Sequence, residues 1–230
     1  MKKLQHKWAL ITGSSRGIGQ QIALGLAAEG CNIILHGRTL ASIQETKARL
    51  SAYSIEIAEA CGALDSPEEV AAIVAAVHSG PGRVDILYNN AAIMTPGQSM
   101  WEIPHSDWLK TFQVNLYAVV QLCNAFAPAM AQRGFGRIVN ITSGIQDQPD
   151  LTVYSVSKGA IDKYTKDLAA QMQGTNVLIS HVDPGWLRTD LGGPNAEHPV
   201  ESVLPGALVP ALLPDFGPNG QFFAAQDYRH

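Results

Sequence analysis

A tyrosine and a lysine, Tyr154 and Lys158, stand four residues apart in a segment of helical periodicity. Residues at this spacing share one face of a helix, so the phenol and the ammonium would project together. A free tyrosine, with a pKa of about 10, is a poor acid or base near neutral pH. A neighbouring ammonium favours the phenolate and lowers that pKa. The pair could then exchange a proton with a substrate oxygen, while Ser143 gives that oxygen a second hydrogen bond. Alone, such a Tyr–Lys spacing is common and does not indicate a function.

A glycine-rich turn, TGSSRGIG at Thr12–Gly19, lies between an apolar run and a helical segment. In a strand–turn–helix unit Gly13 would permit the tight turn, Gly17 would let the backbone approach a pyrophosphate, and Gly19 would allow close packing of helix on strand. The helix would then direct free N–H groups and a positive dipole end at the phosphates. The turn therefore predicts a dinucleotide site that also includes Ser15, Arg16 and Ile18.

The residues that end the second apolar run indicate which dinucleotide binds. That run ends in Leu35, His36, Gly37 and Arg38, with no carboxylate to bind an adenosine ribose 2′-hydroxyl. Arg38 offers a planar fork for a phosphate, and Arg16 can reach the same region. The pattern favours NADP over NAD, the alternative being two surface arginines.

Short apolar runs alternate with helical periods along the chain. This pattern predicts one doubly wound α/β domain over residues 1–230, with a parallel sheet covered by helices on both faces and ligands at the carboxyl ends of its strands. Strands are expected at Lys7–Thr12, Asn32–His36, Ser54–Ala58, Val84–Asn89, Arg137–Thr142, Val177–Asp183 and Gln221–Phe223. Helices are expected at Ile18–Glu29, Leu40–Ala52, Ser66–Val77, Ser106–Ala131, Val153–Gln171 and Val200–Leu212, with Ser66 and Glu69 forming a capping box.

Composition excludes several classes of protein. The 230 residues carry a net charge of −4, which argues against a nucleic-acid binder. No stretch approaches the roughly 18 to 20 uninterrupted apolar residues of a membrane span, and the N-terminus does not resemble a secretion signal. The three cysteines, Cys31, Cys61 and Cys123, form no CxxC pair, and no histidine spacing suits zinc, so neither disulfides nor a metal are expected. A cytoplasmic setting is the default expectation.

Six motifs occur in an order that resembles the short-chain dehydrogenase/reductase (SDR) family. They are TGSSRGIG at Thr12–Gly19, NNAA at Asn89–Ala92, VN at Val114–Asn115, NITS at Asn140–Ser143, YSVSK at Tyr154–Lys158 and DPGWLRTD at Asp183–Asp190. The resemblance implies a Rossmann-type fold with a seven-stranded parallel sheet of order 3-2-1-4-5-6-7. Ala92 departs from the family, which usually has Gly there.

The resemblance also implies roles for single residues. Tyr154 would be the acid/base, Lys158 would lower its pKa and bind the nicotinamide ribose, Ser143 would orient the carbonyl, and Asn115 would hold a relay water. The remaining cofactor contacts would be the turn at Gly13–Gly19 on the pyrophosphate, Asp65 or its neighbour Leu64 on the adenine, Asn90 and Ala91 near the ribose, and Pro184, Gly185, Trp186 and Thr189 on the nicotinamide.

A short substrate loop near residues 186–200 would close a mostly apolar cleft, which suits a small hydrophobic ketone or aldehyde. The expected lining is Ile93, Met94, Gln146, Trp186, Leu187 and Leu191, beside Ser143 and Tyr154. TDLGGPNA at Thr189–Ala196 looks like small carbonyl reductases of the family. The sequence thus predicts an NADP(H)-dependent carbonyl reductase. The alternatives are a non-catalytic NADP-binding sensor or regulatory protein, and an epimerase or dehydratase. The resemblance also implies that the helices near Ser106 and Val153 pair subunits into a homodimer or homotetramer.

Overall fold

Seven parallel strands form one sheet in the order β3-β2-β1-β4-β5-β6-β7 in the computed structural model, which describes residues 3–95, 97, 99–145 and 147–229. The strands are β1 (Trp8–Ile11), β2 (Asn32–Leu35), β3 (Ile57–Glu59), β4 (Ile86–Asn89), β5 (Gly136–Ile141), β6 (Val177–Asp183) and β7 (Gln221–Ala224). The helices are α1 (Gly17–Ala28), α2 (Gln44–Leu50), α3 (Pro67–Ser79), α4 (His105–Phe112), α5 (Ala118–Arg133) and α6 (Thr152–Gln171). The predicted order and architecture are confirmed.

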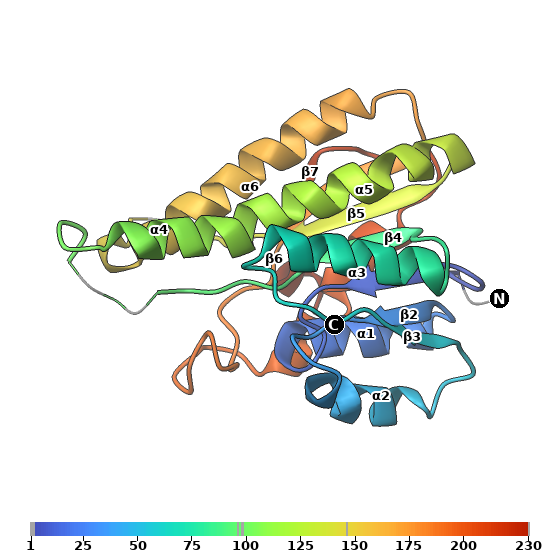
Figure 1. Cartoon of the computed structure of the whole chain (residues 1–230), viewed down its shortest axis with the longest axis horizontal. Helices are drawn as coiled ribbons and strands as arrows, with labels where there is room; N and C mark the ends of the chain where they lie inside the picture. The colour runs from blue at the N-terminus through green and yellow to red at the C-terminus, as the bar shows by residue number, and fades with distance from the viewer. Residues whose placement is uncertain (1–2, 96, 98, 146, 230) are drawn as a thin grey trace.

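The central strands are apolar throughout because each strand faces a hydrophobic core on both sides of the sheet. Successive side chains of a strand point to opposite faces. Ile11 and Tyr88 accordingly pack in the core that contains α1 and α2. Leu10 and Leu87, one residue before each, pack in the second core, beneath α3, α5 and α6. Figure 1 shows these two sets of helices on opposite sides of the sheet.

The direction of the strands brings the functional loops together. All neighbouring strands are parallel, so their carboxyl ends meet at one edge of the sheet. The chain winds outward from β1 to β2 and β3, and then returns to the other side of β1 at β4. The loops after β1 and β4 therefore diverge, which opens a crevice where ligands bind in such folds. The loops after β4, β5 and β6 reach the left end of the molecule in Figure 1.

The structure corrects several element boundaries. The expected helix Ser106–Ala131 is divided into α4 and α5 by a π-helical segment at Gln113–Tyr117. The expected helix at Val200–Leu212 is instead two 3₁₀ segments, Val200–Val203 and Gly206–Leu212. Proline at positions 205 and 210 lacks the N–H that a continuous α-helix needs there. The third strand lies at Ile57–Glu59, later than the expected Ser54–Ala58.

The helical stretch His105–Arg133 is long and apolar enough to cross a membrane by length and composition alone. Half of its most apolar window is buried inside the protein. Leu122 and Phe126 of this stretch belong to the second hydrophobic core. We therefore assign it to the packing of the sheet.

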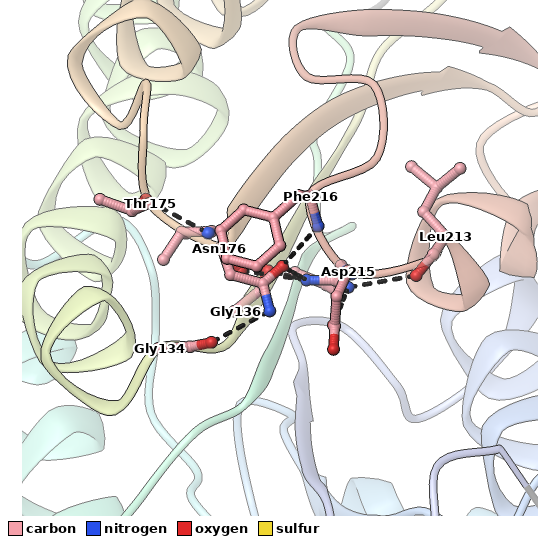
Figure 2. A network of polar contacts seen from close by, with 9 residues as sticks. Gly134, Gly136, Thr175, Asn176, Leu213, Asp215 and Phe216 are labelled. Atoms are coloured by element: carbon pink, nitrogen blue, oxygen red, sulfur yellow. Dashed lines mark hydrogen bonds and ion pairs between the residues drawn. The ribbon is translucent and has the colours of Figure 1, made fainter.

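A polar network fixes the C-terminal segment to the amino ends of β5 and β6 (Figure 2). The side chain of Asn176 donates to the carbonyl of Gly134 over 3.0 Å and accepts from the amide of Phe216 over 3.0 Å. The buried guanidinium of Arg137 donates to the carbonyls of Asn176 and Leu213, both over 3.1 Å. The network thus ties the C-terminal segment to the sheet edge opposite the predicted site, beside a cavity of about 310 Å³ that Arg137 and Leu213 line.

Candidate active site

The glycine-rich turn after β1 can be built only with glycine at two of its positions. Gly13 has φ +65°, and a Cβ there would lie 3.1 Å from the Cα of Ala91. A Cβ on Gly19 would lie 2.3 Å from the carbonyl oxygen of Gly13, which is closer than real Cβ contacts. The first turn of α1 therefore sits directly against the end of β1, and its amide groups face the crevice.

The turn is also fixed to the end of β4 across the crevice. The side chain of Asn90 donates to the carbonyl of Thr12 over 2.8 Å. The backbone amides of Asn90 and Ala91 both donate to the hydroxyl of Thr12, over 2.9 and 3.1 Å. Asn90 lines the cavity described below, whereas Ala91 packs on Gly13. Both residues thus hold the position of the turn, a role that their motif did not reveal.

His36, the residue after β2, connects the turn to the loop after β3. Its Nδ1 accepts from the amide of Gly13 over 3.0 Å, and its Nε2 lies 3.1 Å from the carbonyl of Gly62. The backbone amide of His36 also donates to the hydroxyl of Ser14 over 2.9 Å. Because Nδ1 must accept and Nε2 must donate, the ring is neutral. Burial lowers the pKa of His36 from 6.5 to about 4, although its backbone hydrogen bonds oppose this.

The two arginines expected near the adenosine end have different surroundings. The guanidinium of Arg16 lies 3.0 Å from the carboxylate of Asp190 on the substrate loop, and both side chains are exposed. Arg38 is also exposed, and in the part of the chain that the structure describes it has no polar partner. The backbone of Ser15 accepts a hydrogen bond of 3.0 Å from Thr46, which fixes the turn between these two arginines. Arg38 is thus free to meet a ligand phosphate.

The two candidates for the adenine contact differ in exposure. Leu64 is buried in the second core, whereas Asp65 is exposed. Ser66 caps α3 as expected, accepting from the amide of Glu69 over 3.2 Å. The Glu69 carboxylate does not complete the expected capping box, because it accepts instead from the amide of Ala63 over 2.5 Å. Glu69 therefore fixes the loop that carries both adenine candidates.

A cavity of about 560 Å³ lies at the carboxyl edge of the sheet and is lined by Ser143, Tyr154 and Lys158. Ser143 follows β5, while Tyr154 and Lys158 occupy the first two turns of α6. The Lys158 ammonium donates to the carbonyl of Ile141 over 2.8 Å and lies 5.6 Å from the centre of the Tyr154 ring. The strand end and the helix thus bring a hydroxyl, a phenol and an ammonium to one wall.

The electrostatics of the tyrosine differ from the sequence expectation. The pKa of Tyr154 rises to about 12, mainly through burial, while a hydrogen bond with Ser143 lowers it and the charge of Asp183 raises it. The net shift is therefore opposite to the lowering that the sequence predicted from the Lys158 ammonium, because burial of the phenol dominates. Burial also lowers the pKa of Lys158 to about 8, opposed by Asp162. Tyr154 therefore keeps its proton near neutral pH and suits proton donation.

Asn115 lies in the π-helical segment between α4 and α5, a distortion often found at functional sites. Its side chain accepts from the amide of Ile93 over 2.9 Å and donates to the carbonyl of the same residue over 2.9 Å. It also donates to the hydroxyl of Ser157 over 3.0 Å, between Tyr154 and Lys158 in α6. Asn115 thus joins the loop after β4 to the helix that carries the tyrosine.

The lining of the cavity matches part of the expected substrate set. Met94, Trp186, Leu187 and Leu191 line it as expected, together with the cofactor candidates Ile18, Pro184, Gly185 and Thr189. Ile93 does not, since it packs against the second core, and Gln146 lies outside the described residues. Sequence reasoning missed Ala92, Ile145, Gln148, Leu151, Asp183 and Gly192. Most of these stand in loops without periodicity; the signal for Asp183 was its place at the end of β6.

No group of three or more His, Cys, Asp or Glu side chains among the described residues could hold a metal ion.

Comparisons with known proteins agree with this geometry. Residues 7–199 match the family described as short chain dehydrogenase. "Dehydrogenase/reductase SDR family member 4" of Bos taurus is 34% identical over 188 residues, which cover 81% of this chain and 67% of the relative.

Two crystal structures are similar along nearly the whole chain. A gluconate 5-dehydrogenase of Burkholderia cenocepacia in complex with NADP and tartrate has a TM-score of 0.85 and 27% identity, covering 96% of this chain and 94% of the other. A 3-oxoacyl (acyl-carrier-protein) reductase of Agrobacterium tumefaciens with NADP bound has a TM-score of 0.86 and 26% identity, covering 96% and 93%.

Replacement of His36 by asparagine is expected to flatten the dependence of stability on pH. The unfolded ring, with its pKa of 6.5, binds a proton more readily than the folded ring, with a pKa of about 4. The contribution of the neutral His36 ring to the free energy of unfolding is therefore fully present above pH 6.5. It is lost as the pH falls from 6.5 through 4, by about 3 kcal/mol in total. Urea unfolding across this range measures the slope, and the Asn Oδ1 can still accept from Gly13.

The matched control is His105→Asn, at an exposed position, which leaves the wild-type slope unchanged. Identical pH dependence in His36→Asn and the wild type would show that His36 is not held neutral by the fold.

Proposed function

Because the chain belongs to the short-chain dehydrogenase family, we propose that it is an NADP(H)-dependent oxidoreductase that reduces a small hydrophobic ketone or aldehyde to an alcohol. The observation that carries the proposal is the presence of Ser143, Tyr154 and Lys158 on one cavity at the carboxyl edge of the sheet. Carbonyl–alcohol interconversion is the chemistry that a proton donor, a second hydrogen-bond donor and an ammonium serve in such a site.

The turn after β1 supports binding of the cofactor, because the close approach of Gly19 to the carbonyl of Gly13 holds the first turn of α1, with its free N–H groups, at the crevice. Once bound, the nicotinamide would supply or accept the hydride. The residues proposed to hold it are Gly13, Ser15, Arg16, Gly17, Ile18 and Gly19 for the pyrophosphate, Arg38 with Arg16 for the 2′-phosphate, Leu64 or Asp65 for the adenine, Asn90 and Ala91 near the ribose, and Pro184, Gly185, Trp186 and Thr189 for the nicotinamide. NADP in both similar crystal structures supports this choice.

Each catalytic side chain then has a distinct task. Tyr154 donates its proton to the oxygen of the substrate carbonyl as negative charge develops there, since its pKa of about 12 keeps the phenol protonated. Ser143 holds the same oxygen by a hydrogen bond. Lys158 places a positive charge beside the tyrosinate that remains and binds the ribose. Asn115 positions the relay water through which the proton is restored.

The lining of the cavity supports a hydrophobic carbonyl substrate. Met94, Ile145, Leu151 and Leu191 give it apolar walls. Trp186 stands at its rim, where the indole N–H donates to the carbonyl of Gly192 over 2.8 Å and the ring stays largely exposed. This bond joins the start of the proposed substrate loop to its middle.

Replacement of Tyr154 by phenylalanine is expected to reduce carbonyl-dependent NADPH oxidation by about 10²- to 10⁴-fold, the usual contribution of a positioned proton donor. NADPH binding, followed by its fluorescence, should persist because the ring remains. Tyr53→Phe, on a tyrosine that packs in the first core, serves as the matched control with wild-type turnover.

Turnover of Tyr154→Phe at the wild-type rate would refute the proposed mechanism. Tight binding of NADPH by the wild type without turnover of any ketone or aldehyde would instead favour the alternative, a non-catalytic NADP-binding sensor of the same fold.

Replacement of Arg38 by alanine is expected to weaken NADPH binding by about 10- to 100-fold, the loss of one charge-assisted phosphate contact. NADH lacks the 2′-phosphate, so its dissociation constant should change little. Titration of both nucleotides measures the difference, with Arg229→Ala, exposed near the C-terminus, as the control. Equal losses for the two nucleotides would contradict the assignment of Arg38 to the 2′-phosphate.

We further propose that the protein is a homodimer or homotetramer in the cytoplasm, where its three free thiols would stay reduced. Large apolar side chains are exposed on α4 and α6, including Leu109 at 57% and Val156 at 46%. Leu109→Lys with Val156→Lys should give monomers in size-exclusion chromatography with light scattering. Leu40→Lys, equally exposed beyond β2, should leave the oligomer intact. If the double variant has the same oligomeric state as the wild type, the face that carries Leu109 and Val156 is not the subunit interface.

A further inference from the structure

A carboxylate lies in the cavity beside the proposed catalytic residues, and the reaction described above gives it no task. Asp183 ends β6 and lines the same cavity as Ser143 and Tyr154. Its Oδ1 accepts from the backbone amide of Gly185 over 2.9 Å. In the part of the chain that the structure describes, Oδ2 has no hydrogen-bond donor. One oxygen of Asp183 is therefore fixed by the loop, and the other is available to a ligand.

The backbone beside Ser143 makes room for this carboxylate. A Cβ on Gly144 would lie 2.4 Å from Asp183 Oδ2, which is closer than real Cβ contacts. The oxygen thus lies against the residue that directly follows Ser143. It is also close enough to the phenol for its charge to raise the pKa of Tyr154. The substrate oxygen held by Ser143 and Tyr154 would therefore have a carboxylate as a near neighbour.

No nearby cation neutralises Asp183 within the described lining. Lys158 is the other charged residue of that lining, and its buried ammonium donates to the carbonyl of Ile141 over 2.8 Å. Two arginines of the neighbouring loops have other partners: Arg16 of the glycine-rich turn pairs with Asp190, and Arg188 of the substrate loop donates to the carbonyl of Ala196 over 3.0 Å. An anion placed next to Oδ2 in this partly enclosed site would be repelled by the carboxylate.

We propose that Asp183 determines substrate specificity: it excludes carbonyl compounds that carry a carboxylate and selects those with a hydroxyl or ammonium group next to the carbonyl. Such a donor would bond Oδ2 while the carbonyl oxygen meets Ser143 and Tyr154. The apolar walls would hold the rest of the molecule. The substrate class is then an apolar α-hydroxy or α-amino ketone. This inference rests on the proposed function, because it concerns the same cavity.

Four phenyl ketones that differ only beside the carbonyl test the inference. They are benzoylformate, its neutral methyl ester, 2-hydroxyacetophenone and acetophenone. The wild type should prefer the methyl ester over benzoylformate by at least about tenfold in kcat/KM, since a like-charge contact costs at least 1.4 kcal/mol. It should also prefer 2-hydroxyacetophenone over acetophenone. Asp183→Asn, which keeps an acceptor for the amide of Gly185, should reduce both preferences by about tenfold.

The matched control is Asp167→Asn, which removes the same charge from an exposed residue paired with Lys163 on α6 and should keep both preferences. NADPH binding and thermal unfolding should be unchanged in both variants. Preferences that are the same in Asp183→Asn and the wild type would overturn the inference while leaving the proposed function intact.

If the wild type turns over none of the four ketones, the test of the proposed function passes to other ketones and aldehydes, and calorimetric binding of the same four compounds to the NADPH-saturated protein decides about Asp183. Weaker binding of benzoylformate than of its ester, lost in Asp183→Asn, would support the inference. Equal binding of the two compounds would overturn it.

Discussion

A buried ammonium fixes the geometry on which the whole site depends. Lys158 has 4% of its surface exposed, and its hydrogen bond of 2.8 Å to the carbonyl of Ile141 joins α6 to the last residue of β5. A buried charge without a partner would be costly, so this bond sets the rotation of α6 about its axis. Tyr154, one turn earlier, must then face the cavity, and Ser143, two residues beyond Ile141, must lie opposite it. The burial of the Lys158 ammonium, through its bond to Ile141, therefore brings Lys158, Tyr154 and Ser143 into position around the cavity.

The other side of the crevice depends on close backbone approach rather than on charge. Gly19 packs against the carbonyl of Gly13. The Thr12 hydroxyl accepts from the backbone amides that follow β4, and His36 joins the turn to the loop after β3. The contacts of Thr12 and His36 cross between strands that are separated in sequence but adjacent in the sheet. A neutral histidine suits this place because its two ring nitrogens accept and donate at once. The cofactor side is thus rigid before any ligand binds, which lowers the entropy lost on binding.

The sequence predicted the parts of the molecule that repeat a simple pattern. Apolar runs such as Ile33–Leu35 face two cores, so every residue of the run is apolar. This composition alone indicates a buried strand. The π-helical turn at Gln113–Tyr117 had no such signal, because it is stabilised by the bonds of Asn115 to Ile93 and Ser157. The raised pKa of Tyr154 also depends on burial, which arises only when α6 packs. Spacing alone suggested the opposite direction, since it reveals neighbours in the chain but not the surrounding solvent.

Burial and charge around the cavity favour one protonation state of the tyrosine. Burial and Asp183 both favour the protonated phenol of Tyr154, and burial disfavours the charged form of Lys158. A site with these properties stabilises the state in which the tyrosine holds its proton, which is the state that reduction of a carbonyl consumes. The carboxylate that acts on the tyrosine is also the one that we propose to select substrates by their charge.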